Sequence, residues 1–180
     1  LDKFKALYHL PLCEAVDILL NKIRPRHTAD LERLAHRTRL NPQAPCNRLH
    51  RTQAALARDR GWEPLNFEGA RVLEAGCGPL LGYLPLAAFC GAGRCAGIEP
   101  SYNPAILAHP AHRKKYFLPL WRDLCLLFGP RMEFAPFMEA LAAMEVRATT
   151  IEEAALDPGF DIVLSNSCLE HVFPLDRSLL

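Results

Sequence analysis

The sequence has almost no net charge, because 21 Lys and Arg residues against 20 Asp and Glu residues leave only +1 at pH 7. A strong basic excess is the simplest sequence sign of a protein that binds polyanions, and this chain lacks it. The charges are uneven, however: residues 1–60 hold 12 basic and 6 acidic residues, and residues 61–180 hold 9 basic and 14 acidic ones. Basic residues in helical segments usually form a solvated face, so we do not expect a nucleic acid partner.

The sequence also lacks any C-x-x-C pair and any stretch that resembles a signal peptide. An odd number of cysteines argues against a framework of disulfides. We therefore expect reduced thiols in a cytoplasmic protein. The seven cysteines are Cys13, Cys46, Cys77, Cys90, Cys95, Cys125 and Cys168.

Charge is absent from a run of 19 residues, 75–93, which is close to the length that crosses a bilayer. This run holds five glycines and two prolines. That composition favours a glycine turn followed by a short buried helix, so we predict no membrane span.

Two regions are expected along the chain. Residues 1–60 form a basic helical segment, with an apolar patch at 15–20, a helix capped by Thr28, and another helix from about residue 47 to Arg60, ended by Gly61. Residues 61–180 form an α/β domain. Strands are predicted at 71–73, 95–98, 146–151 and 161–164, and helices at about 118–128 and 134–144. This alternation indicates a parallel sheet, which binds ligands at the carboxyl ends of its strands.

A glycine turn follows the first predicted strand, where residues 72–78 read V-L-E-A-G-C-G. Gly76 and Gly78 allow the backbone to turn sharply and to approach a ligand closely. A dinucleotide would place its pyrophosphate at this turn, where the carboxylate of Glu74 would repel it. The ammonium of S-adenosylmethionine would instead be attracted, so Glu74 favours that cofactor.

Glu99 lies 25 residues beyond Glu74, at the end of the second predicted strand. A carboxylate there can accept hydrogen bonds from both hydroxyls of a ribose. Because both cofactors contain such a ribose, Glu99 predicts a nucleoside ligand without identifying it.

Three segments, V-L-E-A-G-C-G, G-I-E-P and F-D-I-V-L-S-N-S-C-L-E-H-V, together resemble the class I S-adenosylmethionine-dependent methyltransferases over about residues 70–172. The resemblance implies a Rossmann-like parallel sheet, S-adenosylmethionine as cofactor and S-adenosylhomocysteine as product. Thr150, Ile151 or Glu152 would lie beside the adenine, and Asn166 near the methionine moiety. The implied cofactor-binding residues are Glu74, Ala75, Gly76, Cys77, Gly78, Glu99, Pro100, Thr150, Ile151 and Asn166.

The sequence departs from this family in the glycine turn, at its C-terminal end, and in a connection between the second and third predicted strands that is longer than the bare fold needs. Leu80 stands where the third glycine of the turn is expected, with Gly82 two residues later. The sequence ends at Leu180, whereas members of the family continue with three more strands beyond the fourth. We therefore expect residues 61–180 to be a methyltransferase domain that is incomplete at its C-terminal end.

His171 is the candidate catalytic residue, as a base or substrate contact, because it follows Glu170 at the mouth of the predicted pocket. A structural hydrogen-bonding role is the alternative. Some relatives hold a divalent metal with such a Glu-His pair and an acid at the position of Ser167. Because this sequence has a serine there, no metal is expected. Cys77 and Cys168 are expected to pack as small residues rather than to act as nucleophiles.

The expected acceptor is a small or medium metabolite. Methyltransferases of base amino groups typically follow the fourth strand with an acid or Asn, two prolines and an aromatic ring, whereas residues 165–168 read S-N-S-C. An aromatic cluster at 116–137 is expected to be the core of a helical pair, with a cap over an apolar substrate as the alternative.

Two other functions compete with methyl transfer. The G-x-G turn and Glu99 also suit an NAD(P)-dependent oxidoreductase. Leu80 and the missing final strands suit a degenerate domain that serves as a scaffold without catalysis. The sequence identifies neither the methyl acceptor nor the oligomeric state.

Overall fold

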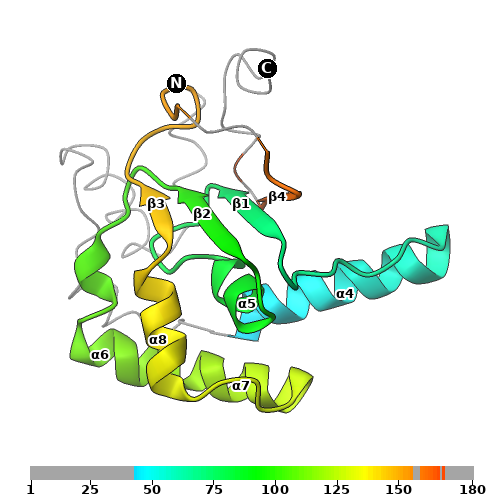
Figure 1. The fold of residues 1–180 in the computed structure, drawn as a ribbon, viewed down its shortest axis with the longest axis horizontal. Coiled ribbons are helices and arrows are strands. Elements are labelled where there is room, and N and C mark those ends of the chain that lie inside the picture. The colour runs from blue at the N-terminus through cyan, green and yellow to red at the C-terminus, as the bar shows by residue number, and fades with distance from the viewer. Residues whose placement is uncertain (1–42, 156–158, 167, 169–180) are drawn as a thin grey trace, which may run out of the picture.

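A computed structural model describes residues 43–155, 159–166 and 168, which form a parallel sheet flanked by helices. The sheet has the order β3-β2-β1-β4 (Figure 1). Ala75 at the end of β1 lies opposite Ile98 on one side and Ser165 on the other, so the carboxyl ends of three strands meet at one edge. The predicted α/β parallel sheet is confirmed, and the arrangement is consistent with a Rossmann-like fold. The strands are β1 (Arg71–Ala75), β2 (Arg94–Ile98), β3 (Glu145–Arg147) and β4 (Ile162–Ser165).

The helices match most of the sequence predictions. Those predicted at 118–128 and 134–144 are confirmed. Helix α4 begins four residues before its predicted start, and Gly61 ends it with a φ of +65° while donating its N–H to the carbonyl of Ala57. The helices are α4 (Gln43–Arg60), α5 (Leu84–Phe89), α6 (Pro110–His112), α7 (Leu118–Phe128) and α8 (Phe134–Ala142), and a π-helical turn (Arg113–Phe117) joins α6 to α7.

The main core lies on one face of the sheet, where α5 packs against β1 and β2, and α8 packs behind α5. The rings of Phe89 and Phe137 meet edge to face with their centroids 6.2 Å apart. The aromatic cluster belongs to this core, as expected: three of its rings are buried and three are partly buried against them. The six are Tyr116, Phe117, Phe137, Trp121, Phe128 and Phe134.

The other face of the sheet has a smaller apolar cluster. Leu73, Ala96 and Ile98 are buried there, and Ile151, Ala154 and Phe160 pack against them. Val163, which pairs with Leu73, is 65% exposed. Among the described residues, this face is therefore covered less completely than the first.

The third strand is shorter than predicted, because β3 ends at Arg147 and not at residue 151. The chain leaves the sheet in a turn in which the carbonyl of Thr150 accepts the N–H groups of Glu153 and Ala154. Ile151 packs against the second face of the sheet. The apolar character of Ile151 therefore reflects packing across the sheet and not continuation of the strand.

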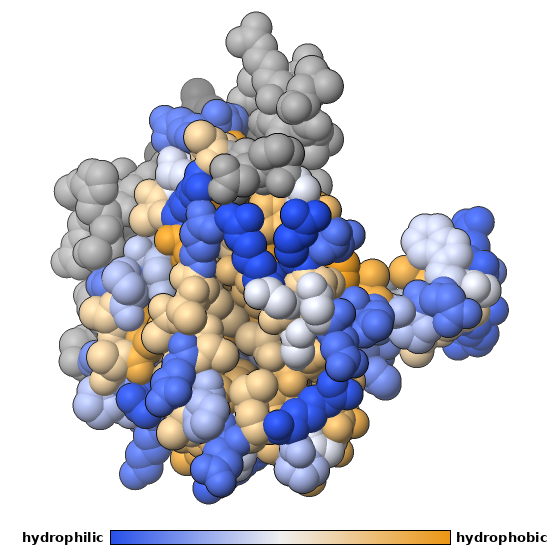
Figure 2. Space-filling model, viewed as in Figure 1, coloured by the Kyte–Doolittle hydropathy of each residue, from blue (hydrophilic) through white to orange (hydrophobic). Residues whose placement is uncertain are grey.

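Helix α4 extends beyond the body of the protein at its C-terminal end (Figure 1). Hydrophilic residues cover most of this projecting end (Figure 2), although Trp62 beside it is 61% exposed. No helix among residues 43–155, 159–166 and 168 is long and apolar enough to span a membrane. The helical features predicted at 15–20 and after Thr28 lie outside the described residues.

The core on the α5 side should dominate stability. Leu124 and Leu126 lie on the same helix, α7, but Leu124 is fully buried and Leu126 is 84% exposed. Leu124→Ala is expected to lower the free energy of unfolding by about 3 kcal/mol, because it leaves a cavity. Leu126→Ala should change it by less than about 0.5 kcal/mol. Urea unfolding of both variants tests this, and equal losses would contradict the packing described.

Candidate functional site

The glycine turn at the end of β1 is tied to the neighbouring strand. The N–H groups of Gly76 and Cys77 both donate to the carbonyl of Ile98, at 2.9 and 3.4 Å. The side chain of Cys77 packs under Gly97, where a Cβ would lie 2.9 Å from its sulfur. Burial raises the pKa of the Cys77 thiol far above its usual range. Cys77 therefore packs as a small residue and is not a reactive nucleophile.

Glu74 points inward, toward the start of α5. Its side chain is 2% exposed, and its Oε2 accepts the N–H of Tyr83 at 2.7 Å. Burial raises the pKa of this carboxyl to about 8, although the backbone N–H groups of Tyr83 and Leu84 act in the opposite direction. In this conformation the carboxyl contacts the turn itself, and direct contact with a ligand's ammonium stays a prediction.

The turn closes tightly around this carboxyl. A Cβ on Gly82 would clash with the Glu74 carboxyl, whose Cδ lies 2.7 Å from the Cβ position. Gly82 has a φ of +48°, and the preceding Leu81 has a φ of +70°, although it is not a glycine. A left-handed backbone costs a residue with a side chain about 1–2 kcal/mol. Gly82, two residues after Leu80, therefore leaves room for the Glu74 carboxyl where a side chain would meet it.

Glu99 points toward the turn from the end of β2. Its Oε2 accepts the N–H of Gly78 at 2.9 Å, and its Oε1 accepts the N–H of Ser101 at 3.0 Å and the Ser101 hydroxyl at 2.5 Å. Glu99 is half-buried, and Pro100 beside it is exposed. The structure therefore brings Glu99 and Gly78 together at the carboxyl edge of the sheet.

The two glycines of the turn have different surroundings. A Cβ on Gly76 would lie 2.5 Å from the Cβ and Sγ of Cys168, so Cys168 fills the space beside this glycine. A Cβ on Gly78 would have no atom within 4 Å, and its φ is +68°. The open side of the turn is therefore at Gly78, beside Glu99.

The other candidate residues follow β3 and β4 in the sequence. Thr150 is half-buried in the turn after β3, and Ile151 is engaged in packing on the second face of the sheet. Asn166 follows β4 directly at the carboxyl edge. His171 lies outside the described residues, so its role as a base stays a prediction. No cluster of three or more metal-ligating side chains occurs within the described part of the chain.

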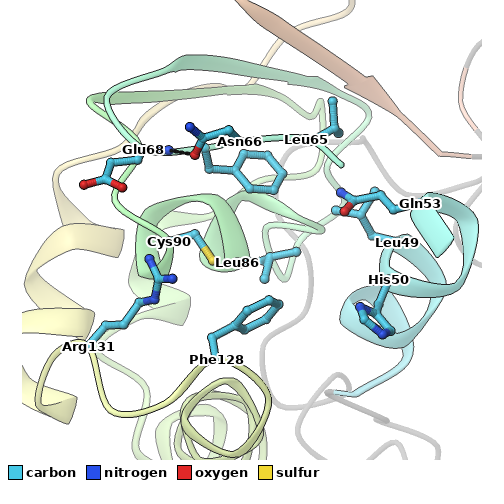
Figure 3. Close-up of a pocket in the computed structure, with 11 residues that line it drawn as sticks. Leu49, His50, Gln53, Leu65, Asn66, Glu68, Leu86, Cys90, Phe128 and Arg131 are labelled. Atoms are coloured by element: carbon cyan, nitrogen blue, oxygen red, sulfur yellow. Dashed lines mark hydrogen bonds between the residues drawn. The ribbon is translucent and has the colours of Figure 1, made fainter. Parts of the chain in front are cut away.

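A pocket of about 170 Å³ lies elsewhere in the structure. Figure 3 shows Leu86 of α5 and Cys90, directly after that helix, above Phe128, with Arg131 and with His50 on α4 around them. Its wall also includes residues 65–68, which precede β1, so it lies toward the amino end of this strand and away from the glycine turn. This pocket does not coincide with the predicted cofactor site.

No protein-family model matches the sequence, and no curated protein matches it.

Sequence reasoning missed three residues that shape this site, namely Tyr83, Cys168 in its position over Gly76, and Ser101. Ser101 had a readable signal, because a serine two residues after an acid can hydrogen-bond to that acid's side chain. Tyr83 contributes its backbone N–H to the hydrogen bond with Glu74. Because almost any residue has this group, the residue type at position 83 could not predict the contact.

The close approach of Glu74 to Gly82 predicts a large effect of a small substitution. Gly82→Ala should lower the free energy of unfolding several times more than Gly129→Ala. Gly129 has a similar left-handed backbone, with a φ of +77°, but open space at its Cβ position, so that variant should lose only about 1 kcal/mol. Chemical unfolding of the two alanine variants tests this, and equal losses would show that Glu74 does not pack against Gly82.

The buried carboxyl of Glu74 also predicts a pH dependence of stability. Folding raises its pKa from 4.5 to about 8, so its neutral form is favoured in the folded state. Its contribution to stability is fully present below pH 4.5 and is lost as the pH rises through about 8. Wild-type protein should therefore lose a few kcal/mol of unfolding free energy relative to Glu74→Gln between pH 5 and pH 9. The exposed Glu139→Gln is the matched control, and a wild-type curve parallel to that of Glu74→Gln would refute the assignment.

Proposed function

We propose that residues 61–180 bind S-adenosylmethionine and support transfer of its methyl group to a small or medium metabolite. The observation that carries this proposal is the position of the Glu74 carboxyl at the start of α5. This position bears on whether the cofactor contains a diphosphate, as NAD(P) does, or lacks one, as S-adenosylmethionine does.

A dinucleotide site of this architecture needs the backbone N–H groups at the start of the first helix for its pyrophosphate. Here the N–H of Tyr83, directly before α5, already donates to Glu74. The carboxyl occupies that donor whether or not it carries a proton, and when ionised it also repels phosphate. This argues against NAD(P) and leaves a nucleoside cofactor without a diphosphate.

Glu99 and Gly78 fit the nucleoside part of such a cofactor. Glu99 offers a half-buried carboxylate held by two backbone N–H groups, and Gly78 offers the open side of the turn. A ribose beside Glu99 would donate a hydroxyl to the carboxylate. Because Gly78 has no side chain, the ligand could approach the backbone closely at this position.

The chain's own residues would act mainly by positioning. When bound, S-adenosylmethionine would supply an electrophilic methyl group on a sulfonium. Glu99 would orient the ribose, and Asn166 at the end of β4 would lie on the side of the methionine moiety. Alignment of the acceptor and exclusion of water would supply most of the rate. His171 is proposed to accept the acceptor's proton where the acceptor still carries one.

A second candidate function is a scaffold without catalysis. Its support is that Cys168 fills the space beside Gly76 and that Glu74 is bonded within the turn. Both features occupy space or hydrogen-bonding groups of the turn that a ligand would otherwise use. The scaffold and the enzyme differ in nucleoside binding, which can be measured directly.

Calorimetric titration with S-adenosylhomocysteine and with NAD tests the proposed function. The thioether nucleoside should bind and NAD should not. Glu99→Gln should weaken nucleoside binding by at least about tenfold, because a hydrogen bond to a charged group is replaced by one to a neutral amide. Glu139→Gln, at an exposed site on α8, is the control and should bind as wild type. Binding of NAD alone would favour the oxidoreductase, and absence of both would favour the scaffold.

A further inference from the structure

We propose that Ser101 forms the second half of the ribose site and accepts the ribose hydroxyl that Glu99 cannot accept. The inference rests on the proposed function, since it concerns the same nucleoside. It arises from counting hydrogen-bond donors and acceptors around a single carboxylate.

The carboxylate of Glu99 is nearly saturated by the protein. An ionised carboxylate has about four lone-pair sites, two on each oxygen. Oε1 accepts both the N–H and the hydroxyl of Ser101, and Oε2 accepts the N–H of Gly78. One site, on Oε2, remains.

A ribose brings two vicinal hydroxyls, each of which can donate one hydrogen bond. With one site left on Glu99, only one of them finds an acceptor on that carboxylate. Ser101 supplies the other. Its only hydroxyl proton is committed to Oε1 of Glu99, so its oxygen presents lone pairs alone. Glu99 and Ser101 thus make a pair of acceptors for a pair of donors.

The backbone holds this pair in a fixed arrangement. The N–H of Glu99 donates to the carbonyl of Arg147 on β3, and the N–H of Tyr102 donates to the carbonyl of Glu99, each at 3.0 Å. Ser101 lies inside this turn and is half-buried. The pair therefore needs little rearrangement when a ligand arrives.

The same arrangement determines which ribose is accepted. A site that presents only acceptors and a negative charge favours a free diol and disfavours a ribose that carries a phosphate on one hydroxyl, which brings acceptors and negative charge. Ser101 therefore acts as a specificity determinant for an unmodified ribose.

The test combines variants of Ser101 with ligands that lack one hydroxyl. Affinities of wild type, Ser101→Ala, Ser101→Thr and the exposed-helix control Thr52→Ala are measured by calorimetry for S-adenosylhomocysteine and for its 2′-deoxy and 3′-deoxy analogues. Ser101→Ala should weaken binding of S-adenosylhomocysteine about tenfold, which corresponds to about one lost hydrogen bond. For one of the two deoxy analogues, Ser101→Ala and wild type should bind with similar affinity, because that analogue already lacks the hydroxyl whose hydrogen bond Ser101 accepts.

Ser101→Thr keeps a hydroxyl and should restore binding, and Thr52→Ala should have no effect. Equal losses for all three ligands in Ser101→Ala would mean that Ser101 only orients Glu99, which overturns the proposal. Unchanged binding of S-adenosylhomocysteine by a folded Ser101→Ala would mean that Glu99 takes both hydroxyls, which also overturns it. If wild type binds S-adenosylhomocysteine but shows no preference for the diol, this inference fails while the proposed function stands. If wild type binds none of the ligands, both fail.

Discussion

The buried contact between the Glu74 carboxyl and the backbone of Tyr83 determines the shape of the glycine turn. It ties the end of β1 to the start of α5, and the Glu74 carboxyl lies within 2.7 Å of the position that a Cβ on Gly82 would take. A buried polar group must find a partner, because leaving it unpaired costs free energy. The start of α5 supplies that partner, so a side chain of the sheet takes the backbone donor that a phosphate would otherwise need.

The two acidic residues of the site differ because of where they stand on their strands. Glu74 precedes the last residue of β1 and faces the side of the sheet covered by α5, so it is enclosed. Glu99 follows the last residue of β2 and lies at the edge, where it remains half-buried. One carboxyl is therefore enclosed by the turn, and we propose that the other contacts a ligand. This division of roles supports a nucleoside ligand that lacks a diphosphate and has a free diol.

Local patterns predicted the architecture well, because short apolar stretches, glycines and alternating elements reflect backbone preferences that a single segment carries. The helix at 118–128, the turn at 76–78 and the placement of Glu99 directly after the second strand are examples. Contacts between distant segments were harder to predict. Ile151 resembled a strand residue because packing across a sheet and pairing within it favour the same side chain. The position of Gly82 departs from the expected glycine pattern, and the side chain that a Cβ there would meet is that of Glu74, eight positions earlier. Cys168 over Gly76 depends on how β4 ends beside β1, which no local pattern records.

The most direct test of the account follows the backbone amides of the turn by nuclear magnetic resonance during two titrations, one with S-adenosylhomocysteine and one with pyrophosphate. The account predicts saturable shifts at Gly78 and Ser101 with the nucleoside, and no saturable shift at Tyr83 or Leu84 with pyrophosphate, because Glu74 occupies that position. Saturable binding of pyrophosphate at Tyr83 and Leu84, with no response of Gly78 to the nucleoside, would contradict it.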